Sequence, residues 1–303
     1  MKRILLFLAM VVVSSSVFAQ GYTATRYPIV LVHTFMGFED IGAIEYWYGI
    51  PQTLQRDGAQ VFTTRVSAVN SSELRGEQLL LQVQQILAIT GAEKVNLIAH
   101  SLGGQTARYV AAVAPDSVAS VTSIGSPVQG TPAGDFVSES LGIAWLAPLL
   151  NNILTGIAVF VDWADGGEPL PQDALAGIDT LTTAGNQIFN QRYPNGVPTE
   201  YCGEGEYERN GIHYFSWAGS YSRITNYFDP SSYVFALTRI FFDEPNNGLI
   251  GRCSSHFGQV IRDDYPMDHL DEVNQLFGLT HPYSASPKSL YRQHANRLRN
   301  MGL

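Results

Sequence analysis

Four short apolar runs in the first half of the chain have the pattern of buried strands. The first of them, YPIVLVH at residues 27–33, is continuously apolar without alternation, which is typical of a strand covered on both faces of a parallel sheet. Three more candidate strands follow at residues 59–66, 95–100 and 118–126. A sheet with helices on both of its faces is therefore expected.

Helical patterns alternate with these runs. The segment SSELRGEQLLLQVQQILAITG at residues 71–91 places leucines and a valine at helical spacing. Asn70, with Glu73 three residues later, has the pattern of a helix start, and Gly91 has that of a helix end. A second helical segment, GGQTARYVAAVA, follows residues 95–100 directly. This alternation predicts an α/β fold with a mostly parallel sheet wound by right-handed crossovers.

The apolar stretch GIAWLAPLLNNILTGIAVFVDW at residues 142–163 has two interpretations. A membrane span is disfavoured because Pro148, Asn151 and Asn152 lie in its middle, and polar groups in hydrocarbon are costly. An ordinary core helix is one interpretation that remains. The other is an amphipathic flap that covers an apolar site and opens at an interface.

The N-terminal segment has the pattern of an export signal. Residues 1–19 combine Lys2 and Arg3 with an apolar run and a small residue, Ala19, where cleavage is expected. The remaining residues 20–303 suit one large domain, because 45% of the chain is apolar and a sizeable core can form.

Charge and cysteine content narrow the partners and the compartment. The formal net charge is −9, and it becomes more negative when Lys2 and Arg3 leave with the signal peptide. Nucleic acids and anionic membrane surfaces are therefore disfavoured as partners. Cys202 and Cys253 are the only cysteines, and export to an oxidising compartment predicts a disulfide between them.

The segment VNLIAHSLGGQTARYV, residues 95–110, has the pattern of a nucleophile elbow around Ser101. Such a turn projects a serine from between a strand and a helix, and it needs small residues two positions either side. Ala99 and Gly103 meet that requirement, with one extra methyl group at Ala99. The alternative is a serine that merely caps the helix that follows.

Oxyanion donors and a base are expected elsewhere in the chain. The loop after the first strand supplies the backbone N–H of Phe35, and the residue after the serine supplies that of Leu102. His33 and His100 are expected to orient these loops, because the base of such hydrolases follows the nucleophile late in the chain. Spacing does not choose among the five later histidines, which are His213, His256, His269, His281 and His294.

His269 lies in an unusually acidic segment, RDDYPMDHLDEVNQLFGL. Its carboxylates are those of Asp263, Asp264, Asp268, Asp271 and Glu272. The segment is either a solvated acidic loop or a source of oxygen ligands for a hard cation such as calcium. A spacing of four places Asp271 and Gln275 on one helical face, if the segment is helical.

Several segments together resemble the secreted Pseudomonas-type bacterial true lipases, a foldase-dependent triacylglycerol lipase family with the α/β-hydrolase fold. The segments that carry this resemblance are YPIVLVHTFMGF, YWYGIPQTLQRDGAQV, RGEQLLLQV, KVNLIAHSLGGQTARYVAAV and HLDEVNQLFGL. The resemblance extends from Tyr27 to the closing YRQHANRL and is weakest over residues 136–185. Those lipases carry a helical lid there, so the resemblance favours a lid at about residues 136–170 within a single domain.

The resemblance implies a role for each matching residue. Ser101 would be the nucleophile, His269 the base, and the N–H groups of Phe35 and Leu102 the oxyanion hole. The family's structural calcium site is matched by Asp229, Asp271, Gln275 and the carbonyl of Leu279. Cys202 and Cys253 match the family disulfide.

Three departures from the family pattern stand out. Ala99 and Thr34 each replace a glycine, and Asn247 occupies the position of the triad aspartate. An amide can hold an imidazole but cannot stabilise an imidazolium by charge, and such a change costs a serine protease about four orders of magnitude in rate. Candidate substitute carboxylates are Asp243, Glu244 and Glu272. Glu272 is the first choice because it lies three residues after His269.

The expected function is that of a secreted, calcium-stabilised lipase that acts on long-chain acylglycerols at an oil–water interface. The alternatives are a short-chain carboxylesterase and a hydrolase-fold binding protein of weak activity, which the loss of the acid at Asn247 would explain. The resemblance also implies a periplasmic, membrane-anchored foldase as a partner before secretion.

Overall fold

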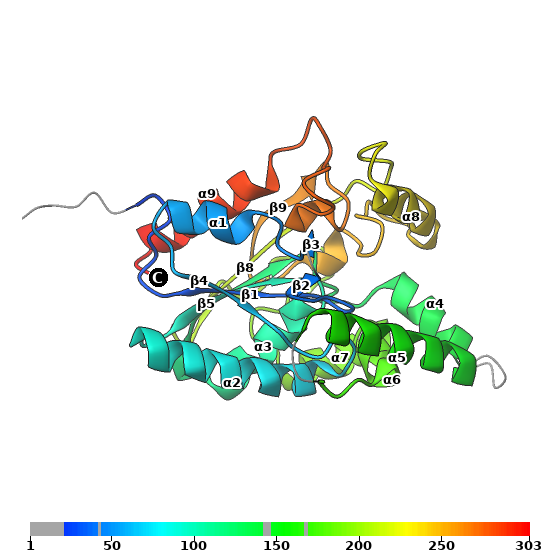
Figure 1. Ribbon diagram of the computed structural model, residues 1–303, viewed down its shortest axis with the longest axis horizontal. Coiled ribbons are helices and arrows are strands. Elements are labelled where there is room, and N and C mark those ends of the chain that lie inside the picture. Colours follow the sequence, from blue (N-terminus) through cyan, green and yellow to red (C-terminus); the bar gives the residue numbers. More distant parts are fainter. Residues whose placement is uncertain (1–20, 42–43, 142–146, 167–168) are drawn as a thin grey trace, which may run out of the picture.

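A computed structural model describes residues 21–303 except 42–43, 142–146 and 167–168 (Figure 1). The predicted signal peptide, residues 1–19, lies outside the described residues, as does part of the predicted lid. Among the helices that are described, none is long and apolar enough to cross a membrane.

The described strands form a mostly parallel sheet of seven strands in the order β4-β1-β5-β6-β8-β7, with β9 also paired to β8. All of its pairings are parallel except that of β7 with β8, and β2 and β3 form a separate antiparallel pair. The bounds are β1 Ile29–Val32, β2 Asp40–Ile41, β3 Ile44–Glu45, β4 Val61–Thr64, β5 Val95–His100, β6 Val118–Ile124, β7 Glu208–Arg209, β8 Ile212–Gly219 and β9 Gln259–Tyr265.

Helices cover both faces of this sheet (Figure 1). One face packs against α1 and α9, and the other against α2 and α3. The bounds are α1 Ile50–Arg56, α2 Ser72–Thr90, α3 Gly103–Val113, α4 Pro132–Leu141, α5 Ala147–Ala164, α6 Ala174–Asp179, α7 Thr183–Arg192, α8 Pro230–Thr238 and α9 Pro287–Asn300. The predicted α/β architecture, a mostly parallel sheet with helices on both faces, is confirmed.

Strand β1 shows why its sequence does not alternate. Ile29 and Leu31 point into the core beneath α1 and α9, whereas Val30 and Val32 point into the core beneath α2 and α3. Because both faces of a central parallel strand are buried, every position is apolar. The three other predicted strands are also present, as β4, β5 and β6.

Helix α2 begins one residue later than the capping pattern predicted. Ser71 is the N-cap, and its side chain accepts a hydrogen bond from the N–H of Leu74 at 3.2 Å. The Asn70 side chain is used otherwise, since its Nδ2 donates to the carbonyl of Pro171 at 2.8 Å. At the other end Gly91 has a φ of 68°, the left-handed conformation expected of a terminating glycine.

Helix α5 lies on the surface and is not the ordinary core helix that was one interpretation of its sequence. Ala158 and Asp162 are buried, whereas Ile157, Phe160 and Trp163 are exposed. The helix is fixed at its C-terminal end, where Arg65 forms ion pairs with Asp162 and with Asp165. The helix therefore leaves several large apolar side chains on the protein surface.

Candidate active site

Ser101 lies in a sharp turn between β5 and α3. Its φ of 54° is unusual for a residue other than glycine, and its N–H donates to the carbonyl of Ile124 at 2.8 Å. A Cβ on Gly103 would lie 2.5 Å from the carbonyl oxygen of Val32, so only glycine fits there. Ala99 is fully buried in β5, where its methyl group is accommodated.

An apolar pocket of about 630 Å³ opens beside this serine. Both Ser101 and His269 line it, so the structure brings these two predicted residues to one cavity. Much of the wall consists of apolar side chains, among them Phe35, Val137, Leu154, Phe235, Leu249 and Leu276. Val137 belongs to α4 and Leu154 to α5, so both helices of the predicted lid segment contribute to the wall.

The loop after β1 leaves a backbone donor free near the serine. In the described part of the chain, neither the N–H of Phe35 nor that of Leu102 donates a hydrogen bond to another group. Arg75 holds this loop, because its Nη2 donates to the carbonyls of His33 at 2.7 Å and Thr34 at 3.1 Å. His33 also orients the loop, as predicted, because its Nδ1 lies 3.0 Å from the carbonyl oxygen of Thr34.

His269 follows β9, on a loop at the same edge of the sheet as Ser101. Burial, together with the neighbouring His100 ring at 4.5 Å, lowers the pKa of His269 to about 3. Its imidazole is therefore neutral before any reaction, which a base requires. The backbone of His269 is tied to the Asn247 loop by a hydrogen bond from its N–H to the Asn247 carbonyl at 2.9 Å.

Asn247 lies beside His269 but presents a donor to it. The Asn247 Oδ1 accepts hydrogen bonds from the N–H groups of Leu249 at 3.1 Å and Ile250 at 2.8 Å. Its Nδ2 is left facing the His269 Nδ1 at 3.0 Å. Turning the amide over would place an NH₂ group against two N–H donors, so the backbone fixes its orientation.

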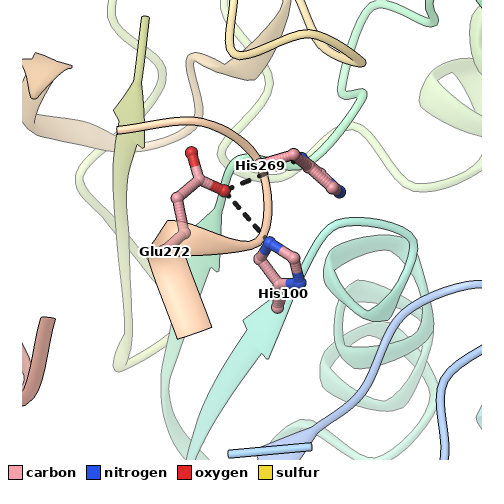
Figure 2. A group of neighbouring side chains, drawn as sticks. All are labelled: His100, His269 and Glu272. Atoms are coloured by element: carbon pink, nitrogen blue, oxygen red, sulfur yellow. Dashed lines mark hydrogen bonds and ion pairs between the residues drawn. The ribbon is translucent and has the colours of Figure 1, made fainter. Parts of the chain in front are cut away.

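Glu272 is the carboxylate that the structure brings to His269 (Figure 2). Its Oε2 lies 3.8 Å from the His269 Nδ1 and 3.0 Å from the Nε2 of His100. Its Oε1 accepts hydrogen bonds from the N–H of Gly219 at 2.7 Å and the Nδ2 of Asn247 at 3.0 Å. Burial raises the pKa of Glu272 to about 7, although His269 and both Oε1 donors oppose that rise.

Gly125 makes room for this carboxylate. A Cβ at Gly125 would lie 2.0 Å from the Glu272 Oε2, and its φ of 49° also disfavours any side chain. The other side of the cluster is supported by Tyr46, whose hydroxyl lies 2.5 Å from the His100 Nδ1. His100 therefore orients Glu272.

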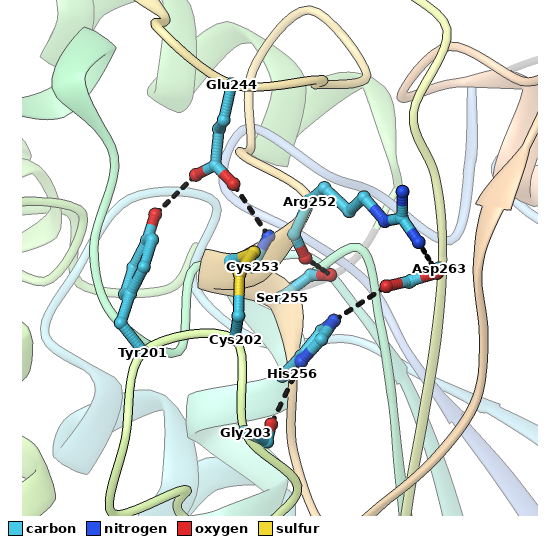
Figure 3. Close-up of a disulfide and its surroundings, with 9 residues drawn as sticks. All are labelled: Tyr201, Cys202, Gly203, Glu244, Arg252, Cys253, Ser255, His256 and Asp263. Carbon is cyan, nitrogen blue, oxygen red and sulfur yellow. Dashed lines mark hydrogen bonds and ion pairs between the residues drawn. A yellow bond between two sulfur atoms is a disulfide. The ribbon is translucent and has the colours of Figure 1, made fainter.

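The other substitute acids lie elsewhere. The predicted disulfide between Cys202 and Cys253 is present, and Glu244 lies beside it (Figure 3). Glu244 accepts hydrogen bonds from the Tyr201 hydroxyl and, at 2.9 Å, from the N–H of Cys253. Glu244 therefore forms its hydrogen bonds beside the disulfide and not with His269. Asp243 is exposed to solvent. The bond from the Cys253 N–H to Glu244 closes the base of the loop that carries Asn247, and the disulfide ties that base to Cys202.

A second acidic cluster is formed by Asp229, Asp268 and Asp271, all of which are fully buried. Carboxylate oxygens of the three lie within 4.8 Å of one another. Asp271 Oδ1 accepts no hydrogen bond from any described group. Burial and the charge of Asp268 raise the pKa of Asp271 to about 9. These acidic groups can bind a metal ion.

Two details of the predicted metal set differ. Residues 271–273 form only a single 3-10 turn, and Asn274 has a φ of 65°, so Asp271 and Gln275 do not share a helical face. The Gln275 Nε2 donates to the carbonyls of Glu45 and Tyr46, which fixes the direction of its side chain and leaves Oε1 outside these two bonds. Leu279 lies next to Thr280. The Asn226 Nδ2 donates a hydrogen bond to the Thr280 carbonyl at 3.4 Å, which connects this turn to the segment that carries Asp229.

Comparisons with known proteins place the chain among named relatives. A family model described as the alpha/beta hydrolase fold matches residues 27–166. The chain is 51% identical to a triacylglycerol lipase of Vibrio cholerae, with 100% of both proteins covered. It is 43% identical to a triacylglycerol lipase of Pseudomonas fragi, over 92% of this chain and 98% of the relative. It is also 37% identical to one of Burkholderia plantarii, over 98% of this chain and 92% of the relative.

Solved structures agree on the fold. The Staphylococcus hyicus lipase superimposes with a TM-score of 0.61 at 17% identity, over 91% of this chain and 97% of that one. The mature Bacillus licheniformis lipase BlEst2 gives a TM-score of 0.60 at 16% identity, over 91% and 93%. At these identities the likeness is one of fold alone.

Proposed function

We propose, on the premise that this chain belongs to the family of bacterial triacylglycerol lipases with the α/β-hydrolase fold, that it hydrolyses long-chain acylglycerol esters at an oil–water interface. The comparisons support a hydrolase that acts on esters. The observation that carries the finer proposal is Ser101 on a strained turn, lining an apolar pocket of about 630 Å³ together with His269. A pocket of that size accommodates a ligand larger than a short acyl group.

The proposed reaction proceeds through an acyl-enzyme on Ser101. The Ser101 Oγ attacks the ester carbonyl carbon while the His269 Nε2 takes its proton, and the N–H groups of Phe35 and Leu102 bind the oxyanion. Collapse of the tetrahedral intermediate breaks the bond to the alcohol, which leaves with the proton from His269. Water then attacks the acyl-enzyme by the same route and releases the fatty acid.

Glu272 is proposed as the acid of this triad. For the His269 Nε2 to accept a proton, its Nδ1 must carry one and must face an acceptor. The nearest group on Asn247 is a donor, so the Glu272 Oε2 is the acceptor that the geometry offers to Nδ1. A shortening of the 3.8 Å separation as the imidazolium forms is expected.

The second acidic cluster is proposed to hold a structural calcium ion. Asp229 and Asp271 would supply carboxylate oxygens, Gln275 a further oxygen, and Leu279 its backbone carbonyl. Asp268 would orient the site, because its Oδ1 accepts from the N–H of Asp271 at 3.0 Å and its Oδ2 from the Thr225 hydroxyl at 2.9 Å. Bound calcium would neutralise buried charge and hold the His269 loop to the segment before α8.

Residues 136–170 are proposed as the lid of a single domain that spans residues 20–303. The exposed apolar side chains of α5 and the Leu154 contact with the pocket support this assignment. Residues 1–19 are proposed to direct export and to be removed, and a periplasmic foldase is the proposed partner before secretion. The sequence pattern of the leader supports export, and the resemblance to a foldase-dependent family supports the partner.

A chain-length series on the purified protein tests the proposal. Rates are measured on glycerol esters from butyrate to palmitate, above and below the solubility limit, for the wild type and Ser101→Ala. We expect rates that rise with chain length, a jump above the solubility limit, and no turnover by Ser101→Ala. A preference for soluble butyrate esters would instead identify a short-chain esterase. Failure of a fluorophosphonate to label Ser101 would favour the binding-protein alternative.

A further inference from the structure

Helix α8 and its flanks carry a second apolar surface that the proposed reaction does not use. The exposed side chains of this surface, here called the α8 face, are Tyr227, Phe228, Tyr233, Val234, Leu237 and Ile240. Leu237 is 73% exposed and Ile240 is 78% exposed. Single apolar side chains on a surface are ordinary, but a contiguous group of this kind marks an interaction site.

The α8 face is almost uncharged. Between Tyr227 and Ile240 the charged residues are Asp229, which is fully buried, and Arg239. The chain as a whole has a net charge of −9, whereas this stretch carries one buried acid and one exposed base. The face therefore suits a surface without net charge, since the single exposed base, Arg239, falls well short of the basic cluster that an anionic membrane attracts.

The opposite side of the same helix belongs to the active site. Phe235 is buried, lines the 630 Å³ pocket, and places its ring 6.1 Å from that of His269. Phe241, just beyond α8, packs its ring 4.9 Å from that of Phe136 in α4. Figure 1 shows α8, α4 and α5 at one end of the molecule. The α8 face and the exposed side of α5 thus flank one pocket.

Hydrogen bonds fix α8 to the loops that carry the site. The Ser232 Oγ accepts from the N–H of Thr225 at 2.6 Å, and the Thr225 hydroxyl donates to Asp268. The Thr238 hydroxyl donates to the carbonyl of Gly248, next to Asn247. A helix tied at both ends to the catalytic loops has a set position relative to the pocket.

We infer that the α8 face is a fixed anchor for an uncharged lipid surface, separate from the α5 flap, and that it turns the pocket mouth toward that surface. This inference rests on the proposed lipase activity and adds the protein surface that attaches the enzyme to lipid. A second copy of the chain is the less suitable occupant, because a protein seated against both helices would cover the pocket between them.

The test compares two sets of surface substitutions. The anchor variant is Val234→Ser/Leu237→Ser/Ile240→Ser, and the matched control is Leu81→Ser/Ile89→Ser on α2, where the side chains are 61% and 75% exposed. Both are made in the Ser101→Ala background, so that hydrolysis does not alter the surface. Binding to phosphatidylcholine vesicles is measured by co-sedimentation. We expect the anchor variant to bind at least about tenfold more weakly and the control to bind as its parent does.

Activity and assembly measurements complete the design. With Ser101 restored, the anchor variant should hydrolyse p-nitrophenyl butyrate below its solubility limit within about twofold of the wild-type rate, because no substituted side chain lines the pocket. Unchanged vesicle binding, or an equal loss in the control, would overturn the inference. A parallel fall in the rate at which the anchor variant hydrolyses the soluble ester would also overturn it. So would a wild-type dimer in sedimentation velocity that is a monomer in the anchor variant. Leu237→Ser alone serves if the triple variant is unstable.

These readouts separate this inference from the proposed function. A protein that binds vesicles through α8 yet turns over no triacylglycerol would retain the anchor and lose the proposed activity. A protein that hydrolyses triacylglycerol while the anchor variant binds vesicles normally would retain the activity and lose the anchor.

Discussion

Glu272 and Asp271 are neighbours in sequence, yet their buried carboxyl groups are accommodated in opposite ways. Glu272 is surrounded by the protein's own donors, which are His100, Asn247 and the N–H of Gly219. Asp271 faces two other carboxylates and has an oxygen with no hydrogen-bond partner among the described residues. Because a buried charge must be paired, the first carboxylate suits a hydrogen-bonded partner of a histidine and the second suits a cation.

Substitution of each carboxylate by its amide should separate the two roles most strongly. We expect Glu272→Gln to lower kcat on a soluble ester by about 10³-fold or more, since the imidazolium of His269 would lose its charge partner. Asp271→Asn, assayed in calcium, should retain most of the rate. Initial rates on p-nitrophenyl butyrate provide the measurement. An active Glu272→Gln beside an inactive Asn247→Ala would assign the acid role to Asn247.

The His100 contact with Glu272 should have the next largest effect. His100→Phe removes the donor to Oε2, and a lost hydrogen bond to a buried charge is expected to lower kcat roughly tenfold to a hundredfold. KM should change little, because His100 does not line the pocket. His100→Gln retains a donor and should recover part of kcat. Equal losses in both variants, with KM rising, would indicate a purely structural role.

Metal removal should affect the second cluster and spare the first. A chelator in excess should lower the thermal midpoint of the wild type by roughly 5 °C, since a bound ion stabilises the folded state by mass action. Asp271→Asn should show no further loss with chelator, whereas Glu272→Gln should respond as the wild type does. Differential scanning fluorimetry with calcium and with magnesium measures this. A chelator response that persists in Asp271→Asn would place the ion elsewhere.

Asn247→Asp should have the smallest effect. The new carboxylate would lie 3.0 Å from the Glu272 Oε1, where two like charges disfavour each other, so we expect kcat to change by less than about threefold. Steady-state rates on the same soluble ester decide the matter. A gain of two orders of magnitude would mean that Glu272 does not serve as the acid and that the natural triad is incomplete.

The sequence predicted the fold well because its signals are local. Continuous apolar runs gave the positions of the central strands, and the small residues around Ser101 gave the elbow. The choice of His269 came from the resemblance, since spacing did not separate it from four other histidines. The α2 cap was misplaced by one residue because Asn70 and Ser71 are both good caps, and a distant contact of Asn70 with Pro171 decides between them.

The site was harder to predict where contacts span the chain. His100 and Glu272 are 172 residues apart, and Tyr46 and Arg75 carry no motif that marks them. Asp268 was visible only as one acid in an acidic segment. The helical spacing of Asp271 and Gln275 was misleading, because Asn274 breaks the segment with a left-handed residue. Side-chain pairs that meet only after folding leave no periodic signal.

Gly125 has a consequence for anyone who wishes to redesign this enzyme. Its missing side chain is the space that the Glu272 carboxylate occupies, so positions 125 and 272 form one unit of design. A mutant library that varies either position alone will be dominated by clashes or by an empty space beside His269. Libraries that vary both together can explore other acids, although the positive φ at position 125 still favours glycine there.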